Sequence, residues 1–334
     1  MLLESLRCAD TARPWLGEAV SILRRGGLVA FPTETVYGLG ADGLNPTALA
    51  RIFEAKGRPR SNPLILHVSG LAMARSLVTT FPKAALNLAE AFWPGPLTLV
   101  LPKRALVPDE ATAGGATVAL RMPDHPVALR LIRAFGGPVA APSANRSEHV
   151  SPTCAEHVLA DLAGRIDLLL DGGPCRSGLE STVVDLSGEV PRILRHGPLA
   201  PAALAAVLGR EPQFHTPSSE VAKSPGQALR HYAPGLPVFL RRGPDPIPCQ
   251  GPLGWMRLGT AEASLPQATV RLDMPEEPRD YGRRLYGALR ELERLPLQAI
   301  VVDLPPEAAP WRTVRDRLFR AAVPAPEAWP PSAD

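Results

Sequence analysis

The feature that most constrains the fold is the alternation of short apolar segments with helical patterns over roughly the first 208 residues. Runs of four to eight apolar residues bounded by Gly or Pro are typical of buried strands, and longer segments with apolar residues every three or four positions are typical of helices. Such alternation predicts an α/β domain. The expected strands are 26–32, 97–102, 117–123, 138–143, 166–173 and 181–187, and helical patterns lie at 82–92, 125–135, 153–163 and 199–208.

One further helix has clear signals at both ends. Asn45 is a good N-cap, Pro46 suits the first helical position, and Gly57 is a typical terminator. Leu49 and Ile52 would lie on one face of this helix. The sequence therefore predicts a helix over 46–56 that packs its apolar face on the sheet.

The pattern changes after residue 208. The segment 209–236 has several prolines and little apolar periodicity, which is typical of a tether without its own core. A second α/β pattern follows, with strands expected at 236–240, 253–258, 268–272 and 298–304, one helix carrying Tyr281, Leu285 and Leu289 on one face, and another carrying Trp311, Val314 and Leu318. We predict a first domain at 1–208, a linker or lid at 209–236, a second domain at 237–325 and a tail at 326–334.

Composition narrows the class of protein. The 334 residues carry a formal net charge of +3, with 45% apolar and 21% charged residues, so neither a basic nucleic-acid module nor a membrane protein is expected. No apolar run approaches the roughly 20 residues of a spanning helix, and the first residues do not resemble a signal peptide. The four cysteines are scattered without a C-x-x-C pair. We therefore expect a cytoplasmic protein with no metal bound by its side chains.

The glycines Gly38, Gly40 and Gly43 match the G-x-G-x-x-G pattern of dinucleotide-binding loops. In such proteins the pattern begins at a strand end, opens a helix, and is followed by an acid about 20 residues later. Here the expected strand ends too early and the acid is missing, so turn-forming glycines are the favoured interpretation. P-loop, G-x-S-x-G and H-E-x-x-H motifs are absent from the sequence.

Polar residues gather where strands and helices end. Thr33, Glu34 and Thr35 follow the first strand, at a position where side chains of open α/β sheets face a crevice. Lys56 and Arg58 lie at the end of the expected 46–56 helix. Lys56 alone could merely satisfy the helix dipole, but the stiff loop after it favours phosphate binding.

His67 stands in an apolar strand. Taken alone, the sequence around it favours a histidine of the core over a ligand-binding group.

Seven motifs occur in the order seen in one protein family: PTETVYGLG (32–40), KGRPRSNPLILH (56–67), WPGPLT (93–98), ALRMPDHP (119–126), APSANRS (141–147), SPT (151–153) and GLESTVVD (178–185). The chain thus resembles the Sua5/YrdC/YciO family over residues 15–208, and the later segments SPGQALRHYAP and DRLFRAA resemble its long Sua5 form. The resemblance implies a twisted, mixed-sheet YrdC-like domain followed by a smaller, Rossmann-like α/β Sua5 domain.

The resemblance also implies an activity. Proteins of this kind are threonylcarbamoyl-AMP synthases, nucleotidyltransferases that make L-threonylcarbamoyladenylate and pyrophosphate from L-threonine, bicarbonate and ATP. Magnesium would be carried with ATP. The product would pass to a tRNA threonylcarbamoyl transferase complex for t6A modification at position 37, and direct tRNA binding is left open.

Site residues follow from the same resemblance. Threonine contacts are implied for Thr35, His67, Arg121, Ala141 and Ser181. ATP contacts are implied for Lys56, Arg58, Asn62, Thr117, Ser143, Ser151, Arg195 and Tyr232. Tyr232 lies in the RHYAP segment of the linker. Because the resemblance implies that this tyrosine contacts ATP, we expect residues 218–234 to close over the site as a lid.

This chain departs from the family pattern at two places. Glu148, His149 and Val150 follow the PSAN motif, where the family commonly continues with glycine, and His196 stands where proline is frequent. Two alternatives to the synthase remain. One is a non-catalytic, YrdC-type RNA-binding module, which the even charge distribution disfavours. The other is a relative of the carbamoyl transferases of hydrogenase maturation, whose cysteine clusters are absent here.

Overall fold

The structure is a computed structural model that describes the main chain of residues 5–7 and all atoms of residues 15–214, 232–242, 251–259, 265 and 268–323. The chain divides into two compact units. The first comprises Met1–Ser147 and Pro152–Gln227, and the second comprises Glu148–Ser151 and Ala228–Asp334. None of the helices in the described part of the chain has the length and apolar character needed to span a bilayer.

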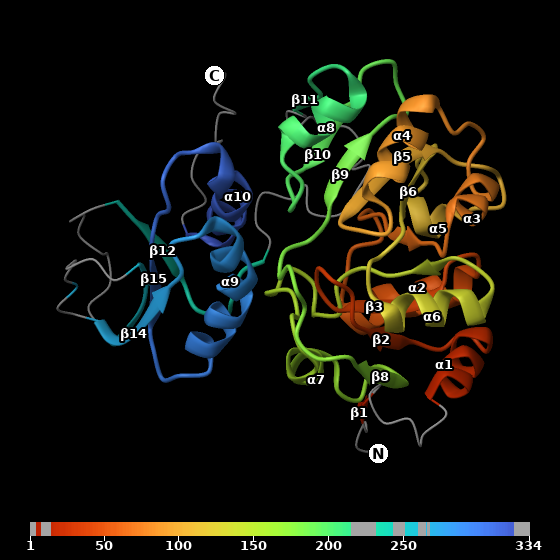
Figure 1. Cartoon of the computed structure of the whole chain (residues 1–334). Coiled ribbons are helices and arrows are strands. Elements are labelled where there is room, and N and C mark those ends of the chain that lie inside the picture. The colour runs from red at the N-terminus through yellow and green to blue at the C-terminus, as the bar shows by residue number, and fades with distance from the viewer. Residues whose placement is uncertain are drawn as a thin grey trace. The chain divides into compact units, whose positions relative to one another are not determined.

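The first unit is built on an 11-stranded mixed sheet with the order β1-β8-β2-β3-β7-β4-β6-β5-β9-β10-β11. Many of these strands are labelled in Figure 1. Its strands are β1 (Ser5–Arg7), β2 (Val29–Phe31), β3 (Gly38–Asp42), β4 (Ile65–His67), β5 (Leu97–Pro102), β6 (Thr117–Arg121), β7 (Val139–Ala140), β8 (Leu168–Asp171), β9 (Thr182–Asp185), β10 (Arg192–Arg195) and β11 (Gln213–Phe214). Parallel pairs such as β4/β6 and β5/β9 alternate with antiparallel pairs such as β2/β3 and β5/β6. The predicted mixed-sheet fold class is confirmed.

Helices cover both faces of this sheet. They are α1 (Trp15–Arg24), α2 (Pro46–Lys56), α3 (Leu71–Ser76), α4 (Lys83–Phe92), α5 (Asp109–Thr112), α6 (Pro126–Phe135), α7 (Ala155–Leu162) and α8 (Pro201–Leu208). Helices α1 and α6 bury residues such as Ile22 and Leu131 with Val29 of β2 in one core. Helices α2 and α4 bury Leu49 and Leu88 in a second core. Each fully buried leucine or isoleucine contributes about 1.5–3 kcal/mol, so this three-layer packing provides much of the unit's stability.

Helix α2 confirms the prediction made from its end signals. The Asn45 side chain accepts hydrogen bonds from the N–H groups of Thr47 (3.0 Å) and Ala48 (3.3 Å), and Pro46 is the first helical residue. Gly57 ends the helix with φ +61°, a left-handed conformation that favours glycine. This firm end fixes the position from which Lys56 and the following loop leave the helix.

The interpretation of these glycines as turn formers is correct for Gly43, which lies in the turn directly after β3, and wrong for Gly38 and Gly40. Gly38 and Gly40 lie in strand β3, antiparallel to β2. A Cβ at Gly40 would come within 2.7 Å of Phe31, and one at Gly43 within 2.8 Å of the Pro138 carbonyl oxygen. These glycines are therefore needed for close strand packing.

The second unit contains a parallel four-stranded sheet of order β12-β15-β13-β14. The strands are β12 (Val238–Arg241), β13 (Leu253–Leu258), β14 (Ala268–Met274) and β15 (Ala299–Asp303), and the helices are α9 (Pro278–Glu293), the 3-10 turn η1 (Ala309–Trp311) and α10 (Arg312–Ala321). The predicted apolar faces of both helices are buried. This arrangement is the smaller Rossmann-like unit that was expected.

The domain limits stay predictions. Residues 215–231, which include most of the expected linker, lie outside the described residues. Strand β11 pairs with β10 inside the first unit, so ordered structure in that unit continues past residue 208.

Candidate ligand site at the strand ends of the first unit

Three adjacent strands bring polar side chains together in the first unit. Parallel strands β4 and β6 end at His67 and Arg121, which are register partners, and antiparallel β5 places Thr98 opposite Arg121. All three residues are buried, with exposures of 2%, 4% and 0%. Because buried polar groups are costly unless they find partners, their concentration at one place needs a chemical explanation.

Arg121 is held by a carboxylate that the resemblance did not assign. Its Nη2 donates to Glu34 Oε1 at 2.6 Å, and both side chains are buried. The second oxygen of Glu34 accepts the N–H of Asp124 at 3.0 Å. A buried pair of this kind fixes the guanidinium in place, and loss of either partner would leave an uncompensated charge.

His67 carries a buried atom available to a ligand. Among the described residues its Nδ1 has no hydrogen-bond partner. Burial, together with the neighbouring Arg121, lowers the pKa of His67 to about 3, so the imidazole is neutral at physiological pH. A neutral, fully enclosed imidazole with one unused nitrogen is suited to a hydrogen bond with a small polar molecule.

Ser181 joins two of the motifs. Its hydroxyl lies 2.7 Å from Thr98 Oγ1 and accepts a hydrogen bond from Arg195 Nη2 at 3.0 Å, while its carbonyl accepts from Arg195 Nε at 3.1 Å. Ser181 immediately precedes β9, which runs parallel to β5. The predicted residues Ser181 and Arg195 are thus brought together at the end of the sheet that also holds Arg121.

Lys56 and Arg58 are anchored by main-chain carbonyl groups. Lys56 Nζ donates to the carbonyl oxygens of Ser143 (2.6 Å) and Asn145. Arg58 donates to the carbonyls of Asn62 (3.2 Å) and Pro63 (3.0 Å). Burial and the adjacent Arg58 hold the pKa of Lys56 well below its usual range, and an anion placed beside the ammonium group would raise it again.

Thr117 lies at the opposite end of β6 from Arg121. The register begins with Ile65 opposite Ala119, so Thr117 on β6 and Pro63, whose carbonyl binds Arg58, both come just before the paired part of their chains. At about 3.3 Å per residue, Thr117 and Arg121 are roughly 13 Å apart along the strand. The predicted residues therefore form two groups, one at each end of the β4/β6 pair.

Thr35 and Ala141 are fixed by local bonds. The Thr35 hydroxyl lies 2.8 Å from that of Thr33, which also accepts the Thr35 N–H at 3.1 Å. The Ala141 N–H donates to the Ile65 carbonyl at 3.0 Å, which joins this residue to the start of β4. Both residues are buried, at 0% and 5% exposure.

Two predicted residues belong to the second unit. Ser151 is completely buried. Tyr232 is stacked on Tyr286 with ring centroids 5.8 Å apart, and the Arg317 guanidinium lies 4.8 Å from its ring centre. Residues 218–231 of the expected lid lie outside the described residues, so the lid stays a prediction.

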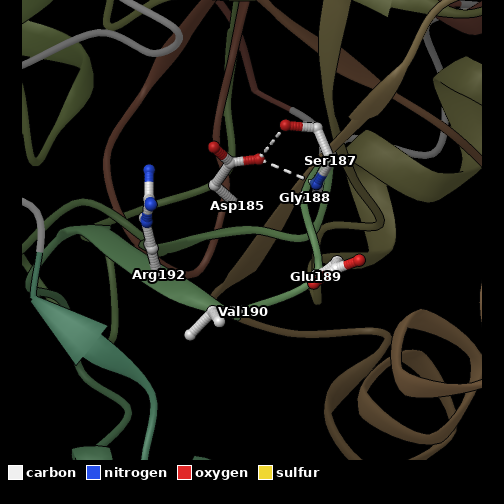
Figure 2. A pocket seen from close by; sticks show the side chains of 6 residues that line it. All are labelled: Asp185, Ser187, Gly188, Glu189, Val190 and Arg192. Atoms are coloured by element: carbon white, nitrogen blue, oxygen red, sulfur yellow. Dashed lines mark hydrogen bonds between the residues drawn. The ribbon is translucent and has the colours of Figure 1, made fainter.

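A separate hollow of about 410 Å³ lies at the turn between β9 and β10 (Figure 2). It is lined by Asp185, Ser187, Gly188, Glu189, Val190 and Arg192, none of them a predicted site residue. Asp185 Oδ1 accepts hydrogen bonds from the N–H (2.9 Å) and hydroxyl (2.6 Å) of Ser187. These bonds are typical of a tight turn, so the turn itself explains why Asp185 and Ser187 are polar, and no ligand is needed to explain them.

The described residues contain no group of three or more histidine, cysteine, aspartate or glutamate side chains suited to a metal ion.

Two residues of the site had no role in the sequence-based prediction. Glu34 was expected only as part of a polar cluster, and Thr98 was not singled out. The register of β5 and β6 reveals both, because it places Thr98 and the Glu34 partner Arg121 opposite each other.

An α/β unit that gathers buried cations, hydroxyls and one neutral imidazole is typical of proteins that bind small anionic metabolites. A family model for Sua5, YciO and YrdC proteins, described as "Telomere recombination", matches residues 21–197, and the model for the C-terminal domain of threonylcarbamoyl-AMP synthase matches residues 199–323. The chain belongs to the Sua5/YciO/YrdC family.

Similar proteins extend over nearly the whole chain. A threonylcarbamoyl-AMP synthase of Pyrococcus abyssi is 41% identical over 91% of this chain and 93% of its own length. One from Bacillus subtilis is 40% identical over 94% of each chain. The crystal structure of P. abyssi Sua5 complexed with L-threonine superposes with a TM-score of 0.87 at 38% identity, covering 96% of this chain and 98% of that one.

Proposed function

We propose that this protein is a threonylcarbamoyl-AMP synthase, a nucleotidyltransferase that forms L-threonylcarbamoyladenylate and pyrophosphate from L-threonine, bicarbonate and ATP. Relatives of that name match nearly the full length of the chain. The observation that carries the proposal is the buried trio of His67, Arg121 and Ser181, because it offers a cation, an unused imidazole nitrogen and a hydroxyl at one end of the sheet.

The trio suits an amino acid with a side-chain hydroxyl. Arg121, already oriented by Glu34, is a natural partner for the threonine carboxylate. His67 Nδ1 and the Ser181 hydroxyl can bind the remaining polar groups, with Thr35 and the main chain at Ala141 closing the pocket. The similarity to a Sua5 structure with bound L-threonine supports this assignment.

The second group of residues suits ATP. Lys56 and Arg58 provide positive charge, with Asn62, Thr117 and Ser143 as further hydrogen-bonding groups. Arg195, which the family resemblance also assigns to ATP, lies beside Ser181 in the first group and would bind the nucleotide from there. Ser151 and Tyr232 complete the set that the family resemblance implies. Magnesium enters with the nucleotide, as part of the substrate.

The reaction joins two anions, which explains the need for buried cations. The threonine amine combines with CO2 derived from bicarbonate, loses a proton and becomes a carbamate. A carbamate oxygen then attacks the α-phosphorus, the bond from that phosphorus to the bridging oxygen breaks, and pyrophosphate leaves. Lys56 and Arg58 offset the repulsion between carbamate and triphosphate, Arg121 orients the threonine carboxylate, and burial keeps water away from the labile product.

We further propose that the product serves tRNA t6A modification in the cytoplasm, where a separate transferase complex consumes it. An unstable mixed anhydride has to be used soon after release, so a partner that accepts it is chemically reasonable. The non-catalytic RNA-binding alternative predicts steeply salt-dependent RNA affinity without ATP turnover.

The deciding experiment measures pyrophosphate release from ATP with the full chain. Release should require L-threonine and bicarbonate together, and omission of either should abolish it. Release that is independent of threonine, or absent from the complete mixture, would rule the proposal out.

A further inference from the structure

The segment Glu148–Ser151 belongs to the second unit although its neighbours in sequence belong to the first. The preceding residue, Ser147, donates its N–H to the Lys56 carbonyl at 2.8 Å, and the following residue, Pro152, accepts the Tyr37 N–H at 2.9 Å. We call residues 148–151 the inserted segment. Both of its ends are therefore tied to motifs that contain proposed ligand-binding residues.

Main-chain atoms of the inserted segment are held from two directions. The Glu148 carbonyl accepts the N–H of Ala233 at 3.0 Å. The Val150 carbonyl accepts a hydrogen bond from Arg290 Nη2 on helix α9. Arg290 and Val150 are 3% and 0% exposed, so this contact is shielded from water and correspondingly strong.

Glu293, one turn after Arg290 on α9, connects these contacts. His149 Nε2 lies 2.9 Å and 3.0 Å from its two carboxylate oxygens, and the Gly235 N–H donates to Oε1 at 2.5 Å. Burial alone would raise the pKa of Glu293, but the hydrogen bonds from His149 and Gly235 hold it below its ordinary value. A single carboxylate thus binds the inserted segment and the chain that follows Tyr232.

The backbone of Glu148 also requires such support. Its φ of +66° is a left-handed conformation that favours glycine. A non-glycine residue in this conformation costs about 1 kcal/mol or more and persists when its surroundings hold it. The bonds to Ala233, Glu293 and Arg290 supply that restraint.

We propose that Glu293 and Arg290 are positioning residues for ATP binding: through the inserted segment they fix Ser151 and the two motif ends joined to it. The proposal rests on the proposed function, which assigns Ser151 to the nucleotide. It gives the C-terminal domain a definite part in the reaction, since residues more than 130 positions later in the sequence set the geometry of an ATP-binding loop.

The test compares Glu293→Ala with Glu291→Ala in the full chain. Glu291 lies on the same helix, half exposed, and among the described residues its carboxylate contacts the exposed Arg284 at 3.6 Å, so it is a matched control. His149→Ala, alone and combined with Glu293→Ala, removes the same hydrogen-bonded contact from the other side. Calorimetry gives the dissociation constants of ATP and L-threonine, and pyrophosphate release gives turnover.

We expect Glu293→Ala and His149→Ala each to weaken ATP binding about tenfold, comparable to the loss of one charge-assisted hydrogen bond. Threonine affinity should change less than about twofold, and the double variant should be no weaker than the weaker single variant. Glu293→Gln should retain part of the ATP affinity, because its amide oxygen still accepts the Gly235 N–H. Glu291→Ala should behave as wild type.

Equal losses for ATP and threonine, or unchanged ATP affinity in folded Glu293→Ala, would overturn the proposal. If Glu293→Ala does not fold, His149→Ala and Glu293→Gln decide by the same criteria. A wild-type chain that binds ATP but forms no pyrophosphate would instead refute the proposed function, while the ATP affinities of the variants would still decide the positioning role.

Discussion

Lys56 in the first unit and the two arginines beside Trp255 in the second unit bury positive charge in different ways. In the first unit Lys56 is 3% exposed, donates to two main-chain carbonyls, and has no carboxylate within 4 Å among the described residues. In the second unit Arg257 Nε lies 2.8 Å from Asp273 Oδ1, and Arg241 Nη1 lies 3.7 Å from Asp303 Oδ1.

The difference concerns charge rather than geometry. A carbonyl oxygen orients a cation without cancelling its charge, whereas a carboxylate neutralises it. The two arginines of the second unit also flank the Trp255 ring, at 5.4 Å and 5.9 Å from its centre, which adds cation–π stabilisation. Lys56 thus has no adjacent carboxylate to compete with an anionic substrate, whereas Arg241 and Arg257 serve the stability of the second unit.

The largest expected effect tests whether the strand ends of the first unit form a hydroxyl-binding pocket. Valine has nearly the same shape as threonine but carries a methyl group in place of the hydroxyl. It should react about 10⁴-fold less efficiently, because the buried polar partners of the hydroxyl would be left unsatisfied. Serine, which lacks only a methyl group, should lose much less. The measurement is kcat/KM from pyrophosphate release, and valine activity within tenfold of threonine would contradict the pocket.

A smaller effect separates the two kinds of buried cation. Lys56→Ala and Arg58→Ala should each lower turnover about 10- to 100-fold, since each removes a charged contact worth roughly 1.5–3 kcal/mol. The control, Arg257→Ala, should leave turnover within about twofold and lower only the free energy of unfolding. If Lys56→Ala and Arg58→Ala both keep full ATP affinity and rate, the phosphate-binding assignment fails.

Arg121 is a buried first-unit arginine that does have a carboxylate partner, and it sharpens the comparison. Arg121→Ala should weaken threonine binding about tenfold and ATP binding less, as measured by calorimetry. Because this change leaves Glu34 buried without its partner, Arg121→Ala combined with Glu34→Gln is the matched control for stability. Equal losses for both ligands would mean that Arg121 is structural.

The last expected effect is on stability in acid and not on ligand binding. The folded chain holds His67 at a pKa of about 3, against 6.5 for an unperturbed histidine, so between these values the unfolded chain binds one more proton. Stability from this group is complete above about pH 6.5 and is lost as the pH falls, by about 1.4 kcal/mol per pH unit. His67→Asn should flatten the pH dependence of urea unfolding between roughly pH 6.5 and 4. An unchanged slope would show that His67 titrates normally.

Local rules predicted the elements well where the signal lies within a few residues. Helix α2 begins and ends at the residues its cap and terminal glycine indicate, and β5 spans the predicted 97–102. The long GLESTVVD motif likewise pointed to Ser181, which the structure joins to Arg195.

Prediction failed where long-range packing decides the outcome. The strand β3 was missed because its glycines Gly38 and Gly40 are required by close contacts with Ala141 and Phe31, which no local pattern reveals. The Glu34–Arg121 pair spans 87 positions and depends on the register of several strands. The segment Glu148–Ser151 belongs to the second unit because of contacts with residues about 140 positions away, and no motif could have indicated such contacts.

The inserted segment has a consequence for synthesis on the ribosome. Its partner Glu293 lies 144 positions after His149, so at 5–20 residues per second it emerges roughly 7–30 s later. During that interval the buried Val150 and the strained Glu148 lack their native contacts, while the strands on either side are already available to pair. Completion of the first unit is therefore coupled to the arrival of the last third of the chain, and a ribosome that stops before α9 should release a chain more accessible to proteases at residues 148–151 than the finished protein.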